Sequence, residues 1–141
     1  MLQKKVWWMY TRSEETQRQI IKILRDAGKH LSAYDITAAM SAGNPKIAPT
    51  TIYRGLAVLV DKGLVHRLES TNSYMACKHE GRHDAAILSI CHSCGEVEES
   101  NAPGLIDEIA NAASEIGFAP SKHVLEMHGV CSSCEPQKAA P

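Results

Sequence analysis

Two short cysteine motifs constrain this chain more than any other feature of its sequence. Cys91 and Cys94 enclose two residues, and Cys131 and Cys134 enclose two more, so two Cys-x-x-Cys motifs stand 36 residues apart. Each motif can bring two thiolates to one ion, and the pair provides the four ligands of a tetrahedral zinc. Because four sulfur ligands leave no open position for water or substrate, we expect this zinc to hold the fold together and not to catalyse a reaction.

The same cysteines could instead form two disulfides or remain as free buried thiols. Disulfides require an oxidising compartment, but the apolar run at residues 6–10, which follows Lys4 and Lys5, is too short for a signal peptide. No apolar run approaches the roughly 18 residues that a membrane span needs. We therefore expect a soluble, cytoplasmic protein that does not contact a membrane.

The net charge of −1 conceals an asymmetry along the chain. Residues 1–80 carry 12 Lys and Arg against 7 Asp and Glu, a net charge of +5, whereas residues 81–141 carry 3 against 9, a net charge of −6. The difference indicates a basic half that can attract phosphate and an acidic half that can hold metal. A charge of +5 over eighty residues is also compatible with an ordinary solvated surface.

The N-terminal half has the sequence pattern of three short helices. An apolar stripe, for which Thr11 or Thr16 could be the cap, predicts a first helix that ends near Gly28. Ser32 and Asp35 resemble a capping box, which predicts a second helix ending near residue 43. A third helix is expected from Pro49, a residue tolerated in a first turn, to about residue 61, before Gly63. This succession favours a helix-turn-helix arrangement.

After Gly63 the apolar period changes from helical to alternating. Residues 64–69 and 74–77 alternate, and residues 70–73 read as a turn, so a β-hairpin is predicted. Three helices followed by a hairpin are typical of a winged helix, whose last helix enters the DNA major groove. The alternative is a small helical bundle that the hairpin merely covers.

The C-terminal part has the pattern of a small sheet with one helix. Residues 86–90 and 97–99 are predicted strands, 103–116 an amphipathic helix, and 118–130 an extended segment that leads to the second cysteine motif. Such a domain buries little by itself, so a symmetric dimer is expected. The predicted fold class is α+β, with the following boundaries: a winged-helix domain at 1–78, a linker at 79–84, an α/β dimerisation domain at 85–134 and a disordered tail at 135–141.

Several stretches resemble the ferric uptake regulator family and, within it, the zinc uptake regulator branch. They are the segment PTTIYRGL from Pro49, the wing sequence GLVHRLESTNSY from Gly63, the first cysteine motif with its following glycine, and the final HGVC from His128. The resemblance runs from about residue 13 to residue 134, whereas the segment through Tyr10 departs from the family pattern. It implies a homodimer that binds a palindromic DNA operator when metal is present and so represses metal-uptake genes.

The resemblance also implies a second zinc site, here called the regulatory site. In the zinc branch its ligands match His66 and Cys77 of the wing, His83 of the linker and Glu99 after the first cysteine motif. The linker differs in length by one residue from the branch pattern, so His79 is a rival for the place of His83. One thiolate, two imidazoles and one carboxylate make a suitable tetrahedral zinc shell, and the sulfur argues against iron(II) or manganese(II). Two zinc ions per chain are therefore expected.

The predicted DNA contacts lie on the second and third helices. Arg54 stands near the start of the third helix, where a guanidinium can bind guanine N7 and O6, and Thr50 and Thr51 stand at its first turn. Tyr34 of the second helix can reach phosphate or base. The alternatives are a solvated arginine and a tyrosine buried in the core.

Other functions are compatible with part of the pattern. A sensor of another metal or of redox state within the same family is one alternative, and a zinc-stapled redox protein with exposed, reactive thiolates is another. A zinc enzyme would need an open coordination position and a general base. The chain has no His-Glu-x-x-His and no deaminase motif, so we expect that it is not an enzyme. A further family metal site would use His123, but the residues at its partner positions are Ala85 and Ile87.

Overall fold

A computed structural model describes residues 2–43, 47–78, 86–121 and 123–135 of the chain. The chain divides into two compact units, Met1–Cys77 and Lys78–Pro141, and each unit is described by itself. In the described residues, the first unit combines three helices with a three-stranded sheet, and the second combines one helix with another three-stranded sheet. This confirms the predicted α+β class. None of the described helices is both long enough and apolar enough to cross a membrane.

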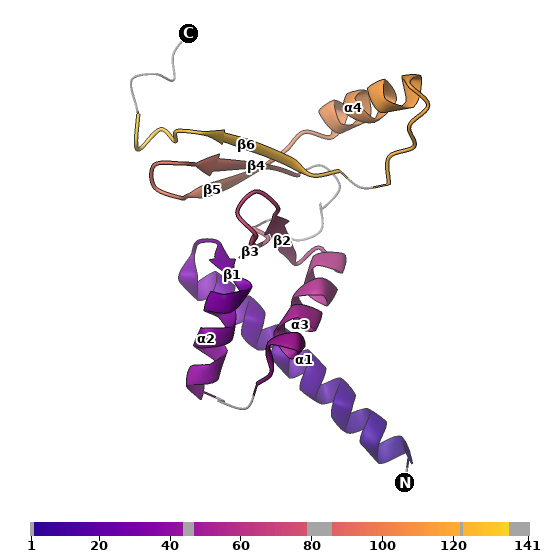
Figure 1. Ribbon diagram of the computed structural model, residues 1–141, viewed down its shortest axis with the longest axis vertical. Helices are drawn as coiled ribbons and strands as arrows, with labels where there is room; N and C mark the ends of the chain where they lie inside the picture. Colours follow the sequence, from indigo (N-terminus) through magenta and orange to yellow (C-terminus); the bar gives the residue numbers. More distant parts are fainter. Residues whose placement is uncertain (1, 44–46, 79–85, 122, 136–141) are drawn as a thin grey trace. The chain divides into compact units, whose positions relative to one another are not determined.

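The first unit is a three-helix domain that ends in a β-hairpin (Figure 1). Its three helices and three strands follow the chain in the order α1 (Leu2–Ala27), β1 (Leu31–Ser32), α2 (Ala33–Gly43), α3 (Pro49–Asp61), β2 (Val65–Leu68) and β3 (Ser73–Ala76). The sheet has the antiparallel order β1-β3-β2. This arrangement is the predicted winged helix, with β2 and β3 as the wing.

One hydrophobic core joins the three helices to the wing. All of its members are less than a tenth exposed, and it consists of Ile20, Leu24, Ala33, Ile36, Met40, Ile52, Leu56, Leu59, Val65 and Tyr74. The residues of α1 and α3 recur at helical spacing, so each helix turns one apolar side to the core and leaves the other side exposed. The exposed side of α3 is thereby held in a fixed orientation relative to this core.

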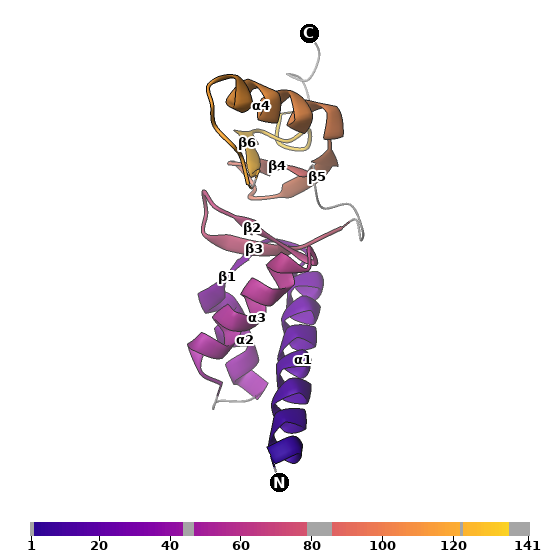
Figure 2. The ribbon, with the colours of Figure 1, turned by 90° about the vertical axis from the view of Figure 1, so that its right-hand side faces the viewer.

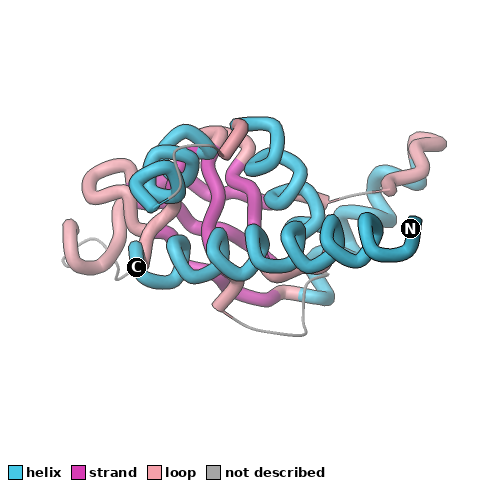
Figure 3. The backbone as a smooth tube through the Cα atoms, turned by 90° about the horizontal axis from the view of Figure 1, so that it is seen from below, coloured by secondary structure: helices cyan, strands magenta, loops and turns pink. Residues whose placement is uncertain are grey.

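The first helix begins much earlier than its apolar pattern predicts. Helix α1 runs unbroken from Leu2 (Figure 3), so a start capped by Thr11 or Thr16 is wrong. Thr16 is buried, and its hydroxyl donates to the Arg12 carbonyl one turn earlier at 3.0 Å. A threonine whose hydroxyl donates to a carbonyl of the preceding turn can lie inside a helix. Its hydroxyl then has a hydrogen-bond partner without capping the N–H groups of a helix end.

The predicted capping box at the start of α2 and the predicted end of α3 before Gly63 are confirmed. The Ser32 hydroxyl accepts the Asp35 N–H at 3.0 Å, and the Asp35 carboxylate accepts the Ser32 N–H at 3.1 Å, which is a reciprocal capping box. The Ser32 hydroxyl also donates to Asp35 Oδ2 at 2.7 Å. This bond first, and the bond from the Ser32 N–H second, lower the pKa of Asp35. At the end of α3, Gly63 has φ +70°, and the Leu64 N–H reaches the Leu59 carbonyl at 3.0 Å. This Schellman turn directs the chain into the wing.

The second unit has a three-stranded sheet with one helix beside it (Figure 2). Its elements are β4 (Ala86–Cys91), β5 (Val97–Asn101), α4 (Pro103–Glu115) and β6 (Leu125–Gly129). The sheet order is β5-β4-β6, antiparallel between β4 and β5 and parallel between β4 and β6. The strand within the predicted extended segment 118–130 is therefore only five residues long.

The second unit buries few apolar side chains. Among its described residues, those less than a tenth exposed are Leu88, Ile90, Cys91, Val97 and Ile106. Helix α4 contributes only Ile106 to this set, while Leu105 and Ile109 are more than two-fifths exposed. A core of this size supplies little stability, so the unit depends on an additional constraint.

Candidate functional site

The four cysteines of the two motifs come together at one end of the sheet of the second unit. Cys91 is the last residue of β4 and pairs in parallel register with Gly129 at the end of β6. The His92 N–H continues this pairing to the Gly129 carbonyl at 2.9 Å. Because the two strands run in parallel and end together, the turns that follow them bring both cysteine motifs to the same place.

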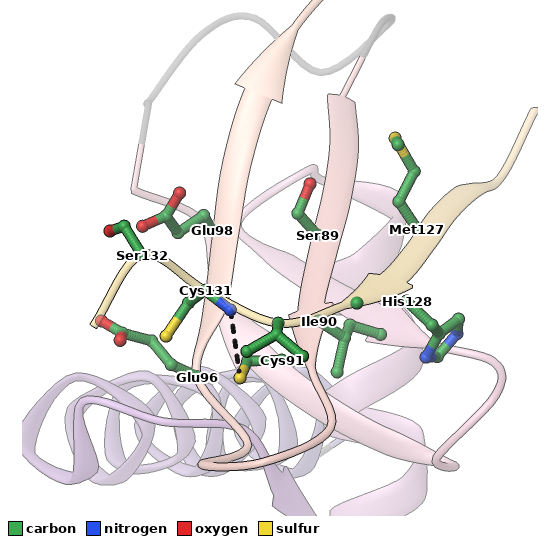
Figure 4. Close-up of a pocket in the computed structure, with 11 residues that line it drawn as sticks. Ser89, Ile90, Cys91, Glu96, Glu98, Met127, His128, Cys131 and Ser132 are labelled. Atoms are coloured by element: carbon green, nitrogen blue, oxygen red, sulfur yellow. Dashed lines mark hydrogen bonds between the residues drawn. The ribbon is translucent and has the colours of Figure 1, made fainter. Parts of the chain in front are cut away.

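The turns place the four sulfur atoms at the spacing of a metal centre. All four Sγ atoms lie within 4.8 Å of one another, with Cys91 to Cys134 at 3.9 Å and Cys94 to Cys131 at 3.8 Å. Four sulfurs at about 2.3 Å from a tetrahedral zinc would lie about 3.8 Å apart. The Cys131 N–H donates to Cys91 Sγ at 3.3 Å (Figure 4), a bond that favours a thiolate. The donor set and its spacing therefore fit zinc.

The thiols influence one another strongly. The Cys131 N–H is the main cause that lowers the pKa of Cys91 to about 6, with a further contribution from the Cys94 N–H. In contrast, the thiols of Cys131, Cys94 and Cys91 raise the pKa of Cys134 to about 12. The Cys91 thiolate thus forms easily, whereas ionisation of Cys134 is opposed by the neighbouring thiols. A bound divalent cation removes this opposition, because coordinated thiols are deprotonated.

Two of the residues predicted for the regulatory site lie together on the wing. His66 is half-buried on β2, and Cys77, which directly follows β3, is only 7% exposed. The Cys77 N–H donates to the Leu64 carbonyl at 3.0 Å, which fixes the backbone at the base of the hairpin. A ring nitrogen of His66 and the sulfur of Cys77 lie within 4.8 Å of each other. None of the five cysteines forms a disulfide.

The other predicted ligands belong to the second unit. Glu99 is half-buried on β5 opposite Leu88, whereas the adjacent Glu98 is exposed and opposite Ser89. The two carboxylates therefore lie on opposite faces of the sheet. Glu99 Oε2 accepts the N–H of Lys78 at 3.2 Å. His83 and its rival His79 lie outside the described residues.

His123 and His128 are not members of the four-cysteine cluster. His128 lies on β6, and its Nε2 is 3.6 Å from a carboxylate oxygen of Glu126. His123 is exposed and precedes β6. Figure 4 shows Ile90 and His128 on one side of the sheet, with Ser89, Glu98 and Met127 directed to the other. A cavity of about 300 Å³ is lined by residues that include Ser89, Glu98, Met127, His128 and Cys131.

The predicted DNA-contacting residues are all exposed on the first unit. Tyr34, in the first turn of α2, is 81% exposed, so it is not a core residue. Thr50, Thr51 and Arg54 are exposed on α3, and Ile52 between them is fully buried. These three side chains in the first two turns of α3 are therefore exposed, while Ile52 packs the helix against the core.

Two residues of interest were not singled out from the sequence. Tyr53 is 56% exposed next to Arg54, and its place beside the buried Ile52 in the helical pattern could have indicated its exposure. Lys78 binds Glu99 through a backbone N–H, and a contact over 21 residues through a main-chain atom leaves no signal in the sequence.

The chain resembles known proteins over most of its length. The sequence pattern of the ferric uptake regulator family matches residues 10–128. The zinc uptake regulation protein of Escherichia coli (strain K12) is 36% identical over 118 residues, which cover 82% of this chain and 68% of that protein. The peroxide operon regulator of Bacillus subtilis (strain 168) is 31% identical over 119 residues, with coverages of 82% and 78%.

A solved structure also resembles the chain. The structure of a zinc uptake regulator complexed with zinc and DNA is similar with a TM-score of 0.80 at 32% sequence identity. The match covers 89% of this chain and 84% of that one.

Proposed function

We propose that this chain, which belongs to the ferric uptake regulator family, is a zinc-responsive transcriptional repressor. When zinc is bound, it would bind a palindromic DNA operator as a homodimer and repress zinc-uptake genes. The observation that carries this proposal is the buried thiol of Cys77 beside His66 on the wing. A thiolate and an imidazole favour zinc over the harder ions iron(II) and manganese(II).

The proposed metal sites have different tasks. Cys91, Cys94, Cys131 and Cys134 would hold one zinc, which closes the ends of β4 and β6 into a single unit. His66, Cys77, His83 and Glu99 would hold a second zinc as the regulatory site, giving two ions per chain. His66 and Cys77 belong to the first unit and Glu99 to the second, so an ion shared by all of them would link the units.

DNA binding would use the exposed residues of α2 and α3. Arg54 would read a guanine edge, Thr50 and Thr51 would contact the entry to the major groove, and Tyr34 would reach phosphate or base. In a dimer, two such helices must match half-sites about 34 to 36 Å apart, or a multiple of that spacing. A zinc ion that links the two units of each chain would limit the separations that the helices can adopt.

The apolar surface of the second unit supports the homodimer. Its most exposed large apolar residues are Leu105, Ile109, Ile116, Phe118, Val124 and Met127. A monomer that exposes so much apolar surface beside so small a core would be stabilised by covering it. A second copy offers an identical surface, and a dimer of this kind has the two-fold symmetry of a palindromic operator.

The proposal is tested by measuring zinc content, oligomeric state and DNA binding before and after chelation. The DNA is a double-stranded site selected from a random-sequence pool by the zinc-loaded protein. Mild chelation should remove one zinc per chain and abolish specific binding, while the dimer persists. A protein that binds the selected site equally well after this loss would not be a zinc-responsive repressor.

The same measurement distinguishes the other sensors of this family. A peroxide or iron sensor would respond to iron(II) or to peroxide at the regulatory site. This alternative is relevant because the chain is similar to the peroxide operon regulator of Bacillus subtilis. Restoration of DNA binding by zinc but not by iron(II) supports the zinc proposal. Loss of binding on peroxide treatment with all metal retained would favour the alternative.

Substitution of Arg54 by alanine should weaken specific DNA binding by about 1 to 3 kcal/mol and affect random DNA less. The reason is that a guanidinium bound to a base edge contributes mainly to discrimination, whereas a phosphate contact contributes to both kinds of DNA. Competition binding on the selected site and on a shuffled duplex measures both losses. Thr37→Ala, on α2 and half-buried, is a control for general damage. Equal losses on the two duplexes would reduce Arg54 to a phosphate contact.

A further inference from the structure

Lys78, the first residue of the second unit, is attached to β5 at two points. Its backbone N–H donates to Glu99 Oε2 at 3.2 Å, and its side-chain Nζ donates to the Val97 carbonyl at 3.4 Å. Lys78 is thus held beside β5, the strand that carries Glu99. The bond to Glu99 is charge-assisted, and such bonds are stronger than neutral ones.

The bond restricts the orientation of the Glu99 carboxylate. The Lys78 N–H binds one of its oxygens, Oε2, at 3.2 Å. Carboxylates that bind metals are commonly held by such hydrogen bonds, which fix their orientation and raise metal affinity. The neighbouring Glu98 lies exposed on the opposite face of the strand. The N–H of Lys78 therefore distinguishes one of two adjacent carboxylates.

The position of Lys78 in the chain adds a second constraint. The peptide unit between Cys77 and Lys78 is planar and rigid, and the α-carbons at its ends are about 3.8 Å apart. The N–H that orients Glu99 belongs to this unit, and the thiol of Cys77 is attached to its other end. We propose that the backbone N–H of Lys78 is a positioning group that holds the Glu99 carboxylate ready for zinc at the regulatory site. This inference rests on the proposed function, because it takes Glu99 and Cys77 as ligands.

A proline at position 78 removes the N–H, and an alanine keeps it. The full-length Lys78→Pro and Lys78→Ala proteins, each with zinc in the four-cysteine cluster, are titrated with cobalt(II) as a probe of the regulatory site. The thiolate-to-cobalt absorption band reports the bond between cobalt and Cys77. A merely structural effect of the substitution would not change this bond selectively. We expect the proline variant to bind cobalt about tenfold more weakly than the alanine variant. Equal affinities would overturn the positioning role.

A second measurement does not depend on the folding of the proline variant or on its effect on Cys77. Amide hydrogen exchange at Lys78 is compared between the natural protein and Glu99→Ala, both without metal at the regulatory site. We expect exchange to be severalfold faster in Glu99→Ala, and equal rates would overturn the inference. If neither the natural protein nor Lys78→Ala binds cobalt through Cys77, the regulatory site of the proposed function fails, and the inference fails with it.

Discussion

Cys94→Ser should cost the chain one zinc ion, the dimer and part of its helical signal together. A structural zinc contributes an apparent binding free energy of about 10 to 16 kcal/mol. A whole domain is commonly stable by only about 5 to 15 kcal/mol, and the second unit has a small core. Loss of the ion is therefore sufficient to unfold that unit. Metal analysis, sedimentation and thermal circular dichroism measure the three losses.

The matched control for this variant is Ser93→Ala, which changes an exposed residue inside the same cysteine motif. It should keep the zinc content, the dimer and the melting temperature of the natural protein. The structural assignment would be wrong if Cys94→Ser stayed a well-folded dimer with an unchanged melting temperature.

Cys77→Ser should have the opposite profile. It should keep the dimer and the zinc of the four-cysteine cluster but lose the zinc dependence of operator binding, because a serine hydroxyl is a poor substitute for a zinc-bound thiolate. A coupling of this kind is commonly worth about 1 to 3 kcal/mol, or 5- to 150-fold in affinity. Binding of the selected DNA is measured with and without added zinc, together with zinc content and thermal melting.

Thermal melting is needed here because Cys77 is buried, and a buried hydroxyl can lower stability by itself. His92→Ala is the control, since His92 is an exposed residue outside both proposed ligand sets. It should retain zinc-dependent binding. Tight, zinc-responsive binding by Cys77→Ser would contradict the assignment of Cys77 to the regulatory site.

Features set by neighbouring residues were predictable from the sequence. The capping box of Ser32 and Asp35 and the turn at Gly63 depend on bonds between residues at most five apart. The cysteine cluster was predictable as well, because two Cys-x-x-Cys motifs have few other uses in one chain. The helix-to-strand change after Gly63 predicted the wing, since the apolar period itself changes there.

Features that depend on distant partners were not predictable in the same way. Strand β1 is two residues long, and it exists because Leu31 and Ser32 pair with Tyr74 and Ser73. The start of α1 was missed because its first turns do not belong to the apolar stripe that signalled the helix. The N–H of Lys78 is a main-chain group, so its bond to Glu99 follows from the fold and not from residue type.

The measurement that tests the central claim most directly is operator binding against buffered free zinc. The full-length protein, with zinc in the four-cysteine cluster, is titrated on the selected palindromic DNA at fixed salt, since salt alone changes affinity for DNA. We predict a saturable increase in affinity as free zinc rises, with no increase for iron(II) or manganese(II). Zinc should also bind more tightly in the presence of the DNA, and by the same factor, because the two effects are reciprocal. An affinity for the DNA that stays constant across the zinc range would contradict the claim that this chain is a zinc-responsive repressor.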